Sequence, residues 1–453
     1  MKNFGNHIHF LGIGGISQSA IALILKSLGH RITGSDAKES HITQNLIKNG
    51  IDVEIDGTSR HIYNADMLVV SAAIKEDDRE LILAKGLKKP IISRAEALGM
   101  LAEEYAHVIS VAGSHGKTTT TGMIAKIFMQ AKLDPTIHIG GELDFIGGNV
   151  RVGGKGFFIT EACEYYDSFL QIKSDVSVIL NIQKDHLDYF KTFSNINKSF
   201  KKFAKNTKQN GIVVYSSDDK NAIKKYRKSI SFSMNNNGVL EARNIQEYDK
   251  GKFMFNVYFM GLKLAKIKLS VYGKHNINNA LAAIAVALYY GIDFKDIKKA
   301  LYKFSGVERR FKTYGNFKGA KVIHDYAHHP TEIKASINVA KKLTKGQIFV
   351  CFQPHTYSRT KHLLNEFINS FKGSNHTLFF KVYSAREKES DGINHEELAK
   401  EVAKVHTNCY AFDNYQNMKK YLEVNVKKKD IILVLGAGDI ENFAEFLTTN
   451  PWQ

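Results

Sequence analysis

Apolar runs of strand length alternate with helical patterns along the whole chain. The stretch HIHFLGI at 7–13 is an apolar strand that ends in a glycine turn, and a helical pattern follows at 17–29. A second strand follows at 31–36. The strand–turn–helix pattern restarts near residue 105 and again after residue 311. This alternation predicts an α/β architecture.

The two restarts divide the chain of 453 residues into three predicted domains. The predicted domains are 1–104, 105–310 and 311–453. Within the middle domain, polar alternation between Ser231 and Lys268 suggests antiparallel strands. The strongly apolar helix that follows, NNALAAIAVALYYG, is expected to stop at Gly291.

The composition narrows the class of protein. The chain carries 63 Lys and Arg against 45 Asp and Glu, a formal net charge of +18. The lysines are dispersed and no nucleic-acid-binding signature is present, so we expect anionic substrates and no nucleic acid partner. No apolar run reaches the roughly 18–20 residues of a membrane span, and the first residues lack a signal-peptide pattern. We therefore expect no membrane insertion and a cytoplasmic location.

The stretch VAGSHGKTTTT at 111–121 predicts a phosphate-binding loop between a strand and a helix. Gly113 and Gly116 let the backbone turn its N–H groups toward a phosphate, and the helix N-terminus adds partial positive charge. Lys117 is placed to reach a terminal phosphate and Thr118 to hold Mg²⁺. The spacing is unusual, because Val111 stands where the first glycine of this loop is expected.

Polar residues follow two later apolar runs, where a triphosphate site needs a metal partner. Glu161 ends one run, and Asp185, His186 and Asp188 follow another. Two such clusters downstream of a phosphate loop favour metal or phosphate binding.

A second glycine turn, HFLGIGGIS, lies close to the N-terminus. Gly12, Gly14 and Ser17 occupy the positions of a G-x-G-x-x-G fingerprint, with serine in the third, and Asp36 lies where a ribose-binding acid is expected. This pattern fits NAD(P), another nucleotide or only a tight turn.

The third predicted domain contributes DYAHHPTE and QPHTYSRT, each after a strand. Adjacent His328 and His329 suggest a metal, but no third ligand has convincing spacing. Arg359, and Arg309 and Arg310 at the domain junction, can bind carboxylate or phosphate through paired N–H groups. Three scattered cysteines form neither a disulfide framework nor a zinc pattern.

Together these motifs resemble the Mur ligases, ATP-dependent enzymes that form amide bonds in peptidoglycan synthesis. The resemblance covers nearly the whole chain and rests on ordered motifs: HFLGIGGIS, AGSHGKTTTT, EACEY, NIQKDHLDYF, GKHNINNALAA, GVERRF, DYAHHPTE, QPHTYSRT, YSAREK and LGAGDI. The short G-x-x-G-K-T loop of this family accounts for the displaced glycine. The resemblance implies a Rossmann-like N-terminal domain for a UDP-sugar, a P-loop ATPase-type central domain and a Rossmann-like C-terminal domain that brings the amino acid.

Within the family, the chain looks most like the member that joins L-alanine to UDP-N-acetylmuramate, using ATP and Mg²⁺. The implied ATP contacts are Gly113, Ser114, His115, Gly116, Lys117, Thr118, Thr119, Asn276, Asn279, Arg310 and Asp325. The implied metal ligands are Thr118, Glu161 and His186. The implied UDP-sugar contacts are Gly12, Ile13, Gly14, Gly15, Ser35, Asp36 and Ser71. The implied amino-acid contacts are Tyr326, His328 and Arg359.

The resemblance also implies a route through an acyl phosphate of the lactyl carboxylate, which the amine of L-alanine then attacks. The implied catalytic residues are Lys117, Glu161, His186, Arg310 and His328, with His328 or His186 as the base for the amine.

Two departures from the family pattern affect these assignments. Cys163 stands where many relatives carry aspartate, and Thr356 where some carry arginine, which shifts the carboxylate clamp toward Arg359.

Two rival functions fit part of the sequence. A ligase that recycles a murein tripeptide shares the architecture, but the GIGG turn and DYAHHPTE favour alanine. A nicotinamide-dependent oxidoreductase would use the glycine fingerprint, but it leaves Lys117 and Glu161 unexplained. The sequence is compatible with a monomer or a homodimer.

Overall fold

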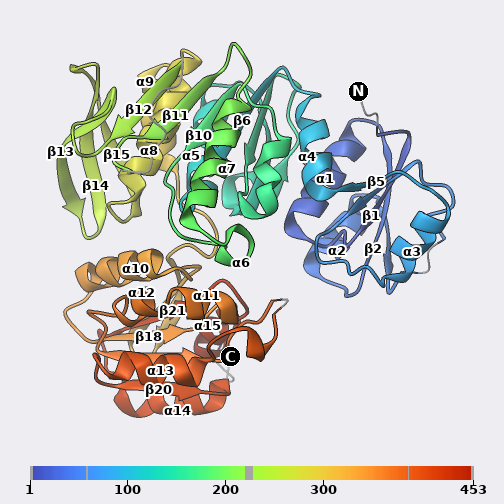
Figure 1. Cartoon of the computed structure of the whole chain (residues 1–453). Coiled ribbons are helices and arrows are strands. Elements are labelled where there is room, and N and C mark those ends of the chain that lie inside the picture. Colours follow the sequence, from blue (N-terminus) through green and yellow to red (C-terminus); the bar gives the residue numbers. More distant parts are fainter. Residues whose placement is uncertain (1–3, 58–59, 220–227, 386, 450–453) are drawn as a thin grey trace.

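The computed structural model describes residues 4–57, 60–219, 228–385 and 387–449, so Arg386 of the YSAREK motif lies outside the described residues. The described residues form three α/β units in chain order, each with its own sheet (Figure 1). The strands of the three sheets lie within 7–93, 107–272 and 312–435. The domain boundaries near 104 and 310 stay predictions.

The N-terminal sheet is parallel, with the strand order β3-β2-β1-β4-β5. Its strands are β1 (His7–Leu11), β2 (Arg31–Asp36), β3 (Asp52–Ile55), β4 (Met67–Val70) and β5 (Ile91–Ser93). Its helices are α1 (Ile16–Ser27), α2 (His41–Lys48), α3 (Arg79–Gly86) and α4 (Arg94–Ala102). Strands β2 and β3 are added on one side of β1, and β4 and β5 are then added on its other side. The crevice beyond the carboxyl ends of these strands is the usual ligand site of such folds.

The described residues of the central unit form one mixed sheet, in the order β15-β14-β13-β12-β11-β10-β6-β9-β7-β8. Its strands are β6 (His107–Ala112), β7 (Thr136–Leu143), β8 (Gly148–Arg151), β9 (Phe157–Glu161), β10 (Val176–Ile179), β11 (Ile212–Ser216), β12 (Ser229–Ser233), β13 (Leu240–Asp249), β14 (Lys252–Phe259) and β15 (Leu262–Tyr272). Its α-helices are α5 (Lys117–Gln130), α6 (Leu187–Phe190), α7 (Phe193–Lys205), α8 (Asn276–Tyr289) and α9 (Phe294–Lys303).

Two local predictions for this unit are confirmed. Strands β13, β14 and β15 pair antiparallel, as the polar alternation after Ser231 indicated. Helix α8 ends at Tyr289, and Gly291 follows in the left-handed region with φ +68°.

The C-terminal sheet has the order β16-β17-β21-β18-β19-β20, and only the pairing of β16 with β17 is antiparallel among the described strands. Its strands are β16 (Lys312–Phe317), β17 (Ala320–Asp325), β18 (Ile348–Phe352), β19 (His376–Phe380), β20 (Cys409–Phe412) and β21 (Ile431–Leu435). Its α-helices are α10 (Pro330–Leu343), α11 (Tyr357–His362), α12 (Leu364–Ile368), α13 (His395–Ala403), α14 (Tyr415–Asn425) and α15 (Glu441–Thr448).

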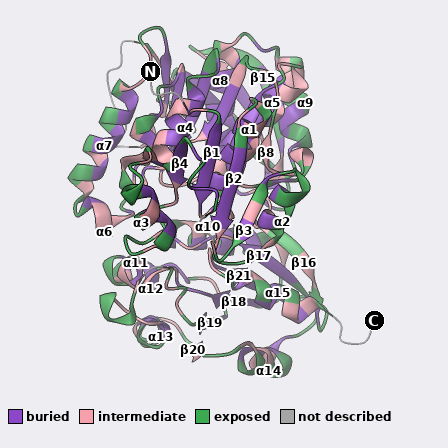
Figure 2. Cartoon of the chain, turned by 90° about the vertical axis from the view of Figure 1, so that its right-hand side faces the viewer, coloured by how far each residue is buried: buried purple, intermediate pink, exposed green. Residues whose placement is uncertain are grey.

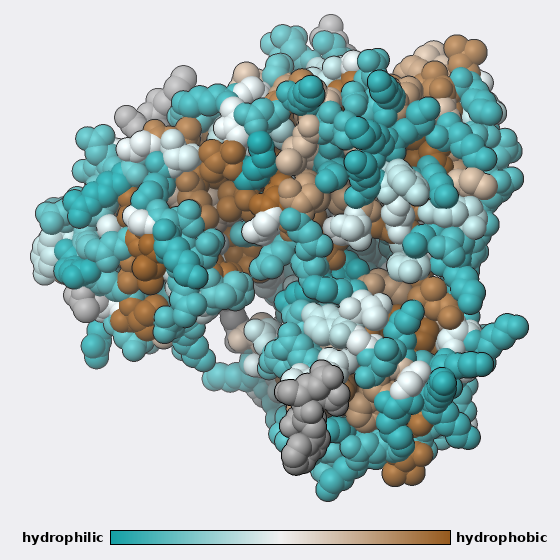
Figure 3. Space-filling view, turned by 180° about the vertical axis from the view of Figure 1, so that it is seen from behind, coloured by the Kyte–Doolittle hydropathy of each residue, from teal (hydrophilic) through white to brown (hydrophobic). Residues whose placement is uncertain are grey.

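The three units are joined in two different ways. One apolar cluster includes Ile21 and Leu98 of the N-terminal unit together with Phe158 and Phe169 of the central unit. Helices α1 and α4 lie at this junction (Figure 1), and strands β1 and β2 are buried beside it (Figure 2). The C-terminal unit has two apolar clusters whose buried members all lie within 317–447. Figure 3 shows a mainly hydrophilic surface, recessed above the C-terminal unit.

Within the described residues, no helix combines the length and the apolar character that crossing a membrane requires.

Candidate active site

The predicted phosphate loop joins β6 to α5 in the central sheet. Gly113 (φ +146°) and Gly116 (φ +85°) both adopt backbone angles that favour glycine. A Cβ on Gly116 would also lie 2.6 Å from Oδ1 of the Asn279 side chain, so this contact adds to the preference for glycine. The N–H groups of Ser114 and His115 donate to Asn181, which fixes the shape of the loop, and the start of α5 is left as the part of the loop suited to an anion.

The Lys117 ammonium is held by a carboxylate that the sequence analysis did not single out. Its Nζ lies 3.1 and 3.0 Å from the two carboxylate oxygens of the buried Glu164. Burial lowers the pKa of Lys117, but Glu164 outweighs burial and the pKa is raised. Lys117 therefore stays charged and is paired inside the protein.

Glu161 ends β9 and combines with Thr118 into a group of oxygen atoms. Its Oε1 accepts a hydrogen bond of 2.8 Å from the backbone N–H of Gly140, and its carboxylate is hydrogen-bonded to the Thr118 side chain. Burial raises the pKa of Glu161, so a nearby cation would stabilise its charged form. Carboxylate and hydroxyl oxygens are hard ligands of the kind that Mg²⁺ prefers, so these two residues fit the predicted metal.

A cavity of about 600 Å³ lies between the central and C-terminal units. Seven predicted ATP contacts line it: His115, Gly116, Thr119, Asn276, Asn279, Arg310 and Asp325. The side-chain amide of Asn279 donates to Oδ1 of Asn276 at 2.8 Å, so the two asparagines face the same side of α8. The structure thus brings together residues that are up to 210 positions apart in the chain, from His115 to Asp325.

Glu332, on the first turn of α10, is a second carboxylate that the sequence analysis did not single out. Its Oε1 lies 3.1 Å from Nδ1 of His115 and 3.6 Å from Nη1 of Arg310. Its Oε2 lies 3.5 Å from Nδ1 of His328. Burial raises the pKa of Glu332, but His328, His115 and Arg310 together outweigh burial and hold the pKa well below its usual range. Glu332 therefore ties the phosphate loop to the C-terminal unit.

A smaller cavity of about 260 Å³ adjoins the same interface and is lined by Asp185, His186, His355 and Arg359, among others. Nε of Arg359 donates to Oδ1 of Asp185 at 3.0 Å, and its Nη1 lies 2.9 Å from Nδ1 of His355. Burial raises the pKa of Asp185, but the Arg359 guanidinium and the neighbouring histidines together outweigh burial and hold the pKa well below its usual range. At the predicted amino-acid site, Arg359 is thus already engaged in a buried ion pair with Asp185.

The structure places the other predicted residues of this region as follows. The ring of His186 stacks on Tyr165 at 4.3 Å, and its Nε2 lies 3.7 Å from Oδ2 of Asp185. Tyr326 lies beneath the Arg310 guanidinium, 4.9 Å from ring centre to Cζ. Nδ1 of His328 lies 3.0 Å from the Tyr326 carbonyl oxygen, and burial lowers the pKa of His328 to about 4. His328 is therefore neutral near pH 7.

The predicted UDP-sugar contacts gather at the carboxyl ends of β1, β2 and β4. The backbone N–H groups of Gly12 and Ile13 donate to the Ser35 carbonyl at 2.9 and 3.0 Å. The backbone N–H of Gly14 donates to Oδ2 of Asp36 at 2.8 Å. Gly15 caps α1, and the N–H of Ser71 donates to the carbonyl of Leu11, the last residue of β1. These residues surround the point where the strand order reverses.

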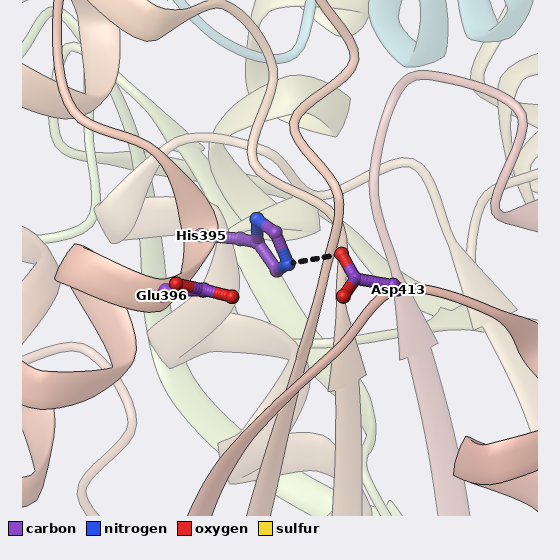
Figure 4. Close-up of side chains that lie close together, drawn as sticks. All are labelled: His395, Glu396 and Asp413. Atoms are coloured by element: carbon purple, nitrogen blue, oxygen red, sulfur yellow. Dashed lines mark ion pairs between the residues drawn. The ribbon is translucent and has the colours of Figure 1, made fainter.

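A separate group of possible metal ligands contributes no residue to the lining of either cavity. His395, Glu396 and Asp413 bring donor atoms within 4.8 Å of one another (Figure 4). Nε2 of His395 lies 3.3 Å from Oδ1 of Asp413, and Nζ of Lys381 lies 3.6 Å from the same oxygen. Because the lysine already supplies the positive charge, we interpret this group as a surface ion-pair cluster.

Comparison with known families identifies the architecture. The model of the Mur ligase family, catalytic domain, matches residues 7–106, that of the Mur ligase middle domain 111–287, and that of the Mur ligase, glutamate ligase domain, 309–438. The chain belongs to the Mur ligase family. A curated UDP-N-acetylmuramate–L-alanine ligase of Caldanaerobacter subterraneus is 44% identical over 98% of this chain and 97% of its own. The enzyme of that name from Clostridium perfringens is 38% identical over 98% of both chains.

Solved structures of Mur ligases give the same fold. The UDP-N-acetylmuramate-alanine ligase of Thermotoga maritima matches with a TM-score of 0.82 and 28% identity, covering 97% of this chain and 98% of its own. A murein peptide ligase of Psychrobacter arcticus matches with a TM-score of 0.73 and 25% identity, covering 98% of both chains. The predicted three-unit α/β fold is confirmed.

Proposed function

We propose that this Mur ligase joins L-alanine to the lactyl carboxylate of UDP-N-acetylmuramate, converting ATP to ADP and phosphate, in peptidoglycan synthesis. The observation that carries the proposal is the cavity between the central and C-terminal units, where Gly116, Asn276, Arg310 and Asp325 converge. The names of relatives at 44 and 38% identity support the same reaction. We propose a cytoplasmic location for this reaction.

ATP would lie in the larger cavity with its phosphates on the loop from Gly113 to Thr119. Asn276 and Asn279 would bind beside the adenine, and Asp325 would bind the ribose. The loop supplies backbone N–H donors and the positive end of the α5 dipole.

Mg²⁺ would be held by Thr118 and Glu161, with His186 as the third predicted ligand. When bound, the ion neutralises charge on the phosphate oxygens. The hydrogen bonds from Gly140 and Thr118 to Glu161 orient its carboxylate for this role.

In the first step, an oxygen of the lactyl carboxylate attacks the γ-phosphorus of ATP, and the bond to the β-phosphate oxygen breaks. The products are an acyl phosphate and ADP. Lys117 and Arg310 offset the charge that develops on the transferred group. Lys117 must exchange Glu164 for phosphate, and Arg310 must turn from Glu332, before either residue can do so.

In the second step, the amine of L-alanine attacks the acyl carbon and phosphate leaves. The substrate carboxylate would bind Arg359, whose orientation is set by Asp185 and His355. The neutral His328 is our preferred base for the amine proton, with His186 as the alternative. Closure of the C-terminal unit over the cavity would keep water from the acyl phosphate.

The UDP-sugar would bind the glycine turn of the N-terminal unit, where Gly12 to Gly15, Ser35, Asp36 and Ser71 surround the crevice. The N–H groups of Gly12 to Gly15 already donate within the protein, so a diphosphate would be attracted by the partial positive charge at the start of α1.

The test is phosphate release from ATP and Mg²⁺ with UDP-N-acetylmuramate and single amino acids or the murein tripeptide. We expect turnover with L-alanine and a product whose mass equals the sugar nucleotide plus alanine less one water. Turnover with the tripeptide alone would move the assignment to the recycling ligase. Absence of turnover with every acceptor would contradict a ligase, and nicotinamide cofactors would then be tested at the glycine turn.

A further inference from the structure

Ser17, the serine in the third position of the glycine fingerprint, faces the central unit. Its Oγ lies 2.8 Å from Nε2 of His138 on β7, and Nη1 of Arg94 donates to the same oxygen at 3.0 Å. His138 is buried, with 3% of its surface exposed. A residue that the fingerprint would assign to a nucleotide is thus committed to a contact between two units.

The contact continues through the central unit to the proposed metal site. Nδ1 of His138 lies 2.8 Å from Oγ1 of Thr160, and Thr160 Oγ1 donates to the carbonyl oxygen of Glu161 at 3.0 Å. The same strand β7 carries Gly140, whose N–H binds the Glu161 carboxylate.

The donors and acceptors fix the direction of this chain of hydrogen bonds. The only hydroxyl proton of Thr160 goes to Glu161, so Nδ1 of His138 must donate to Thr160. A neutral imidazole protonated at Nδ1 accepts at Nε2, so the hydroxyl of Ser17 donates to His138. The sequence of donation is therefore Arg94 to Ser17 to His138 to Thr160 to Glu161.

The surroundings of His138 favour the neutral ring. Burial lowers the pKa of His138 to about 3, with a further lowering by the Arg94 cation that outweighs the opposing effect of the Ser17 backbone. A neutral ring can accept a hydrogen bond from Ser17 and donate one to Thr160. A protonated ring carries an N–H on both nitrogens, so it could not accept from Ser17.

We propose that Ser17 and His138 are positioning residues, which hold the UDP-sugar turn at a fixed place relative to Glu161 and the γ-phosphate. The inference rests on the proposed function, because it concerns the distance between the lactyl carboxylate and ATP. Reacting groups must lie about 3–3.5 Å apart, and a misplacement of about 1 Å can reduce the rate on the order of a hundredfold. Loss of this contact is therefore expected to lower kcat while each substrate still binds.

The test compares Ser17→Ala, which removes the hydroxyl, with Ser17→Thr, which keeps it. We expect kcat with L-alanine to fall on the order of tenfold in Ser17→Ala, with Kd for UDP-N-acetylmuramate and for an ATP analogue, each measured alone, within about twofold of wild type. Ser17→Thr should recover most of kcat. His138→Phe should resemble Ser17→Ala, and the double variant should lose little more, because the two residues act as one unit.

Three outcomes would overturn the inference while wild-type turnover stands: an unchanged kcat in Ser17→Ala, no recovery in Ser17→Thr, or a loss confined to the Kd for the UDP-sugar. The last would make Ser17 a ligand contact. Because Ser17 is only partly buried, we expect its variants to fold. They therefore still test the inference if His138→Phe fails to fold.

If wild type gives no turnover with any amino acid, the proposed function fails first. The positioning role is then measured without chemistry, from spin labels on Lys48→Cys and Lys201→Cys, two exposed sites on the N-terminal and central units. The partly exposed Cys163 and Cys409 are replaced, so that the spin label attaches only to the two introduced cysteines. Ser17→Ala should broaden the distance distribution, and an unchanged distribution would contradict the inference.

Discussion

The central unit meets its two neighbours through opposite kinds of surface. Its contact with the N-terminal unit is built mainly on an apolar cluster that includes Ile21 and Phe158, with hydrogen bonds such as that of Ser17 to His138 beside it. Its contact with the C-terminal unit is charged, with the pairs Arg359–Asp185 and His115–Glu332 and two cavities. An apolar interface resists opening because opening exposes it to water, whereas ion pairs exchange partners with ligands and water. We infer that the C-terminal unit is the one that moves during the reaction.

The charged side of this comparison has a second property. Each cation with a proposed role is already paired with a carboxylate of the protein: Lys117 with Glu164, Arg310 with Glu332, and Arg359 with Asp185. Pairing satisfies buried charge in the absence of substrates. Anionic substrates would replace these carboxylates, so ligand binding and movement of the C-terminal unit should be coupled.

The largest expected effect comes from breaking the charged side at the phosphate loop. Lys117→Ala removes the cation proposed for the γ-phosphate, and we expect kcat to fall on the order of a thousandfold. The control is Lys126→Ala on the same helix, whose ammonium lies over the Phe145 ring. Phosphate release with L-alanine measures both. Comparable losses in the two variants would mean that the helix is damaged and would remove the argument for Lys117.

Arg359→Lys should have the next largest effect. Lysine keeps the charge but cannot donate to Asp185 and His355 while presenting a further N–H pair to a substrate carboxylate. We expect KM for L-alanine to rise roughly ten- to a hundredfold, about 1.4–2.7 kcal/mol, with a smaller change in kcat. Lys361→Arg, at an exposed position on the same helix, is the control. A change in KM for ATP instead would place Arg359 in the other cavity.

The sequence indicates the cations of the charged interface and Asp185, but it does not indicate the roles of the other two carboxylate partners, Glu164 and Glu332. The phosphate loop and the stop at Gly291 are local patterns, whose glycines are required by backbone angles of a few residues. Glu164 and Glu332 take their roles from residues 47 and 217 positions away in the chain. In sequence, Glu332 has the pattern of a helix-capping acid, and it does cap α10 as well.

The apolar side was still harder to predict. Ser17 and His138 are 121 positions apart, and nothing in either stretch indicates the other. In the sequence, Ser17 matches only the nucleotide fingerprint, where serine stands in place of glycine. How two units dock depends on the surface residues that each unit leaves exposed once its own sheet and helices have packed. These residues come from many separate segments, so no single stretch of sequence indicates the contact.

Acid should have the third largest effect, because it lowers the free energy of unfolding through the buried histidines of the charged interface. Burial lowers the pKa of His328 and His329 to about 4 and that of His355 to about 3, below the value near 6.5 of an unfolded histidine. Between those values the unfolded chain binds more protons, so stability is full above pH 6.5 and falls as pH drops toward 4. The loss is about 1.4 kcal/mol per pH unit for each histidine that is fully neutral in the folded state.

Unfolding midpoints between pH 7.5 and 5 measure this dependence. His328→Gln should reduce the dependence of stability on pH by the contribution of one proton, about 1.4 kcal/mol per pH unit. His41→Gln should leave this dependence unchanged, because 78% of the His41 side chain is exposed. A slope that His328→Gln does not alter would mean that this histidine is not buried as a neutral ring.

The smallest expected effect gives the most direct comparison of the two interfaces. Thr331→Ala removes a 3.1 Å hydrogen bond to Gln183 at the charged interface, and Asn149→Ala removes a 2.5 Å bond to the Ile16 carbonyl at the apolar one. Each neutral bond contributes about 0.5–1.5 kcal/mol, so neither variant should shift the unfolding midpoint by more than a few degrees. Hydrogen exchange is the sharper measurement. Exchange should accelerate in α10 of Thr331→Ala but not in α1 of Asn149→Ala, because the apolar cluster holds α1 without that bond. Equal acceleration in both helices would mean that the apolar cluster does not fix the N-terminal unit, and the proposed division between a fixed and a moving neighbour would fail.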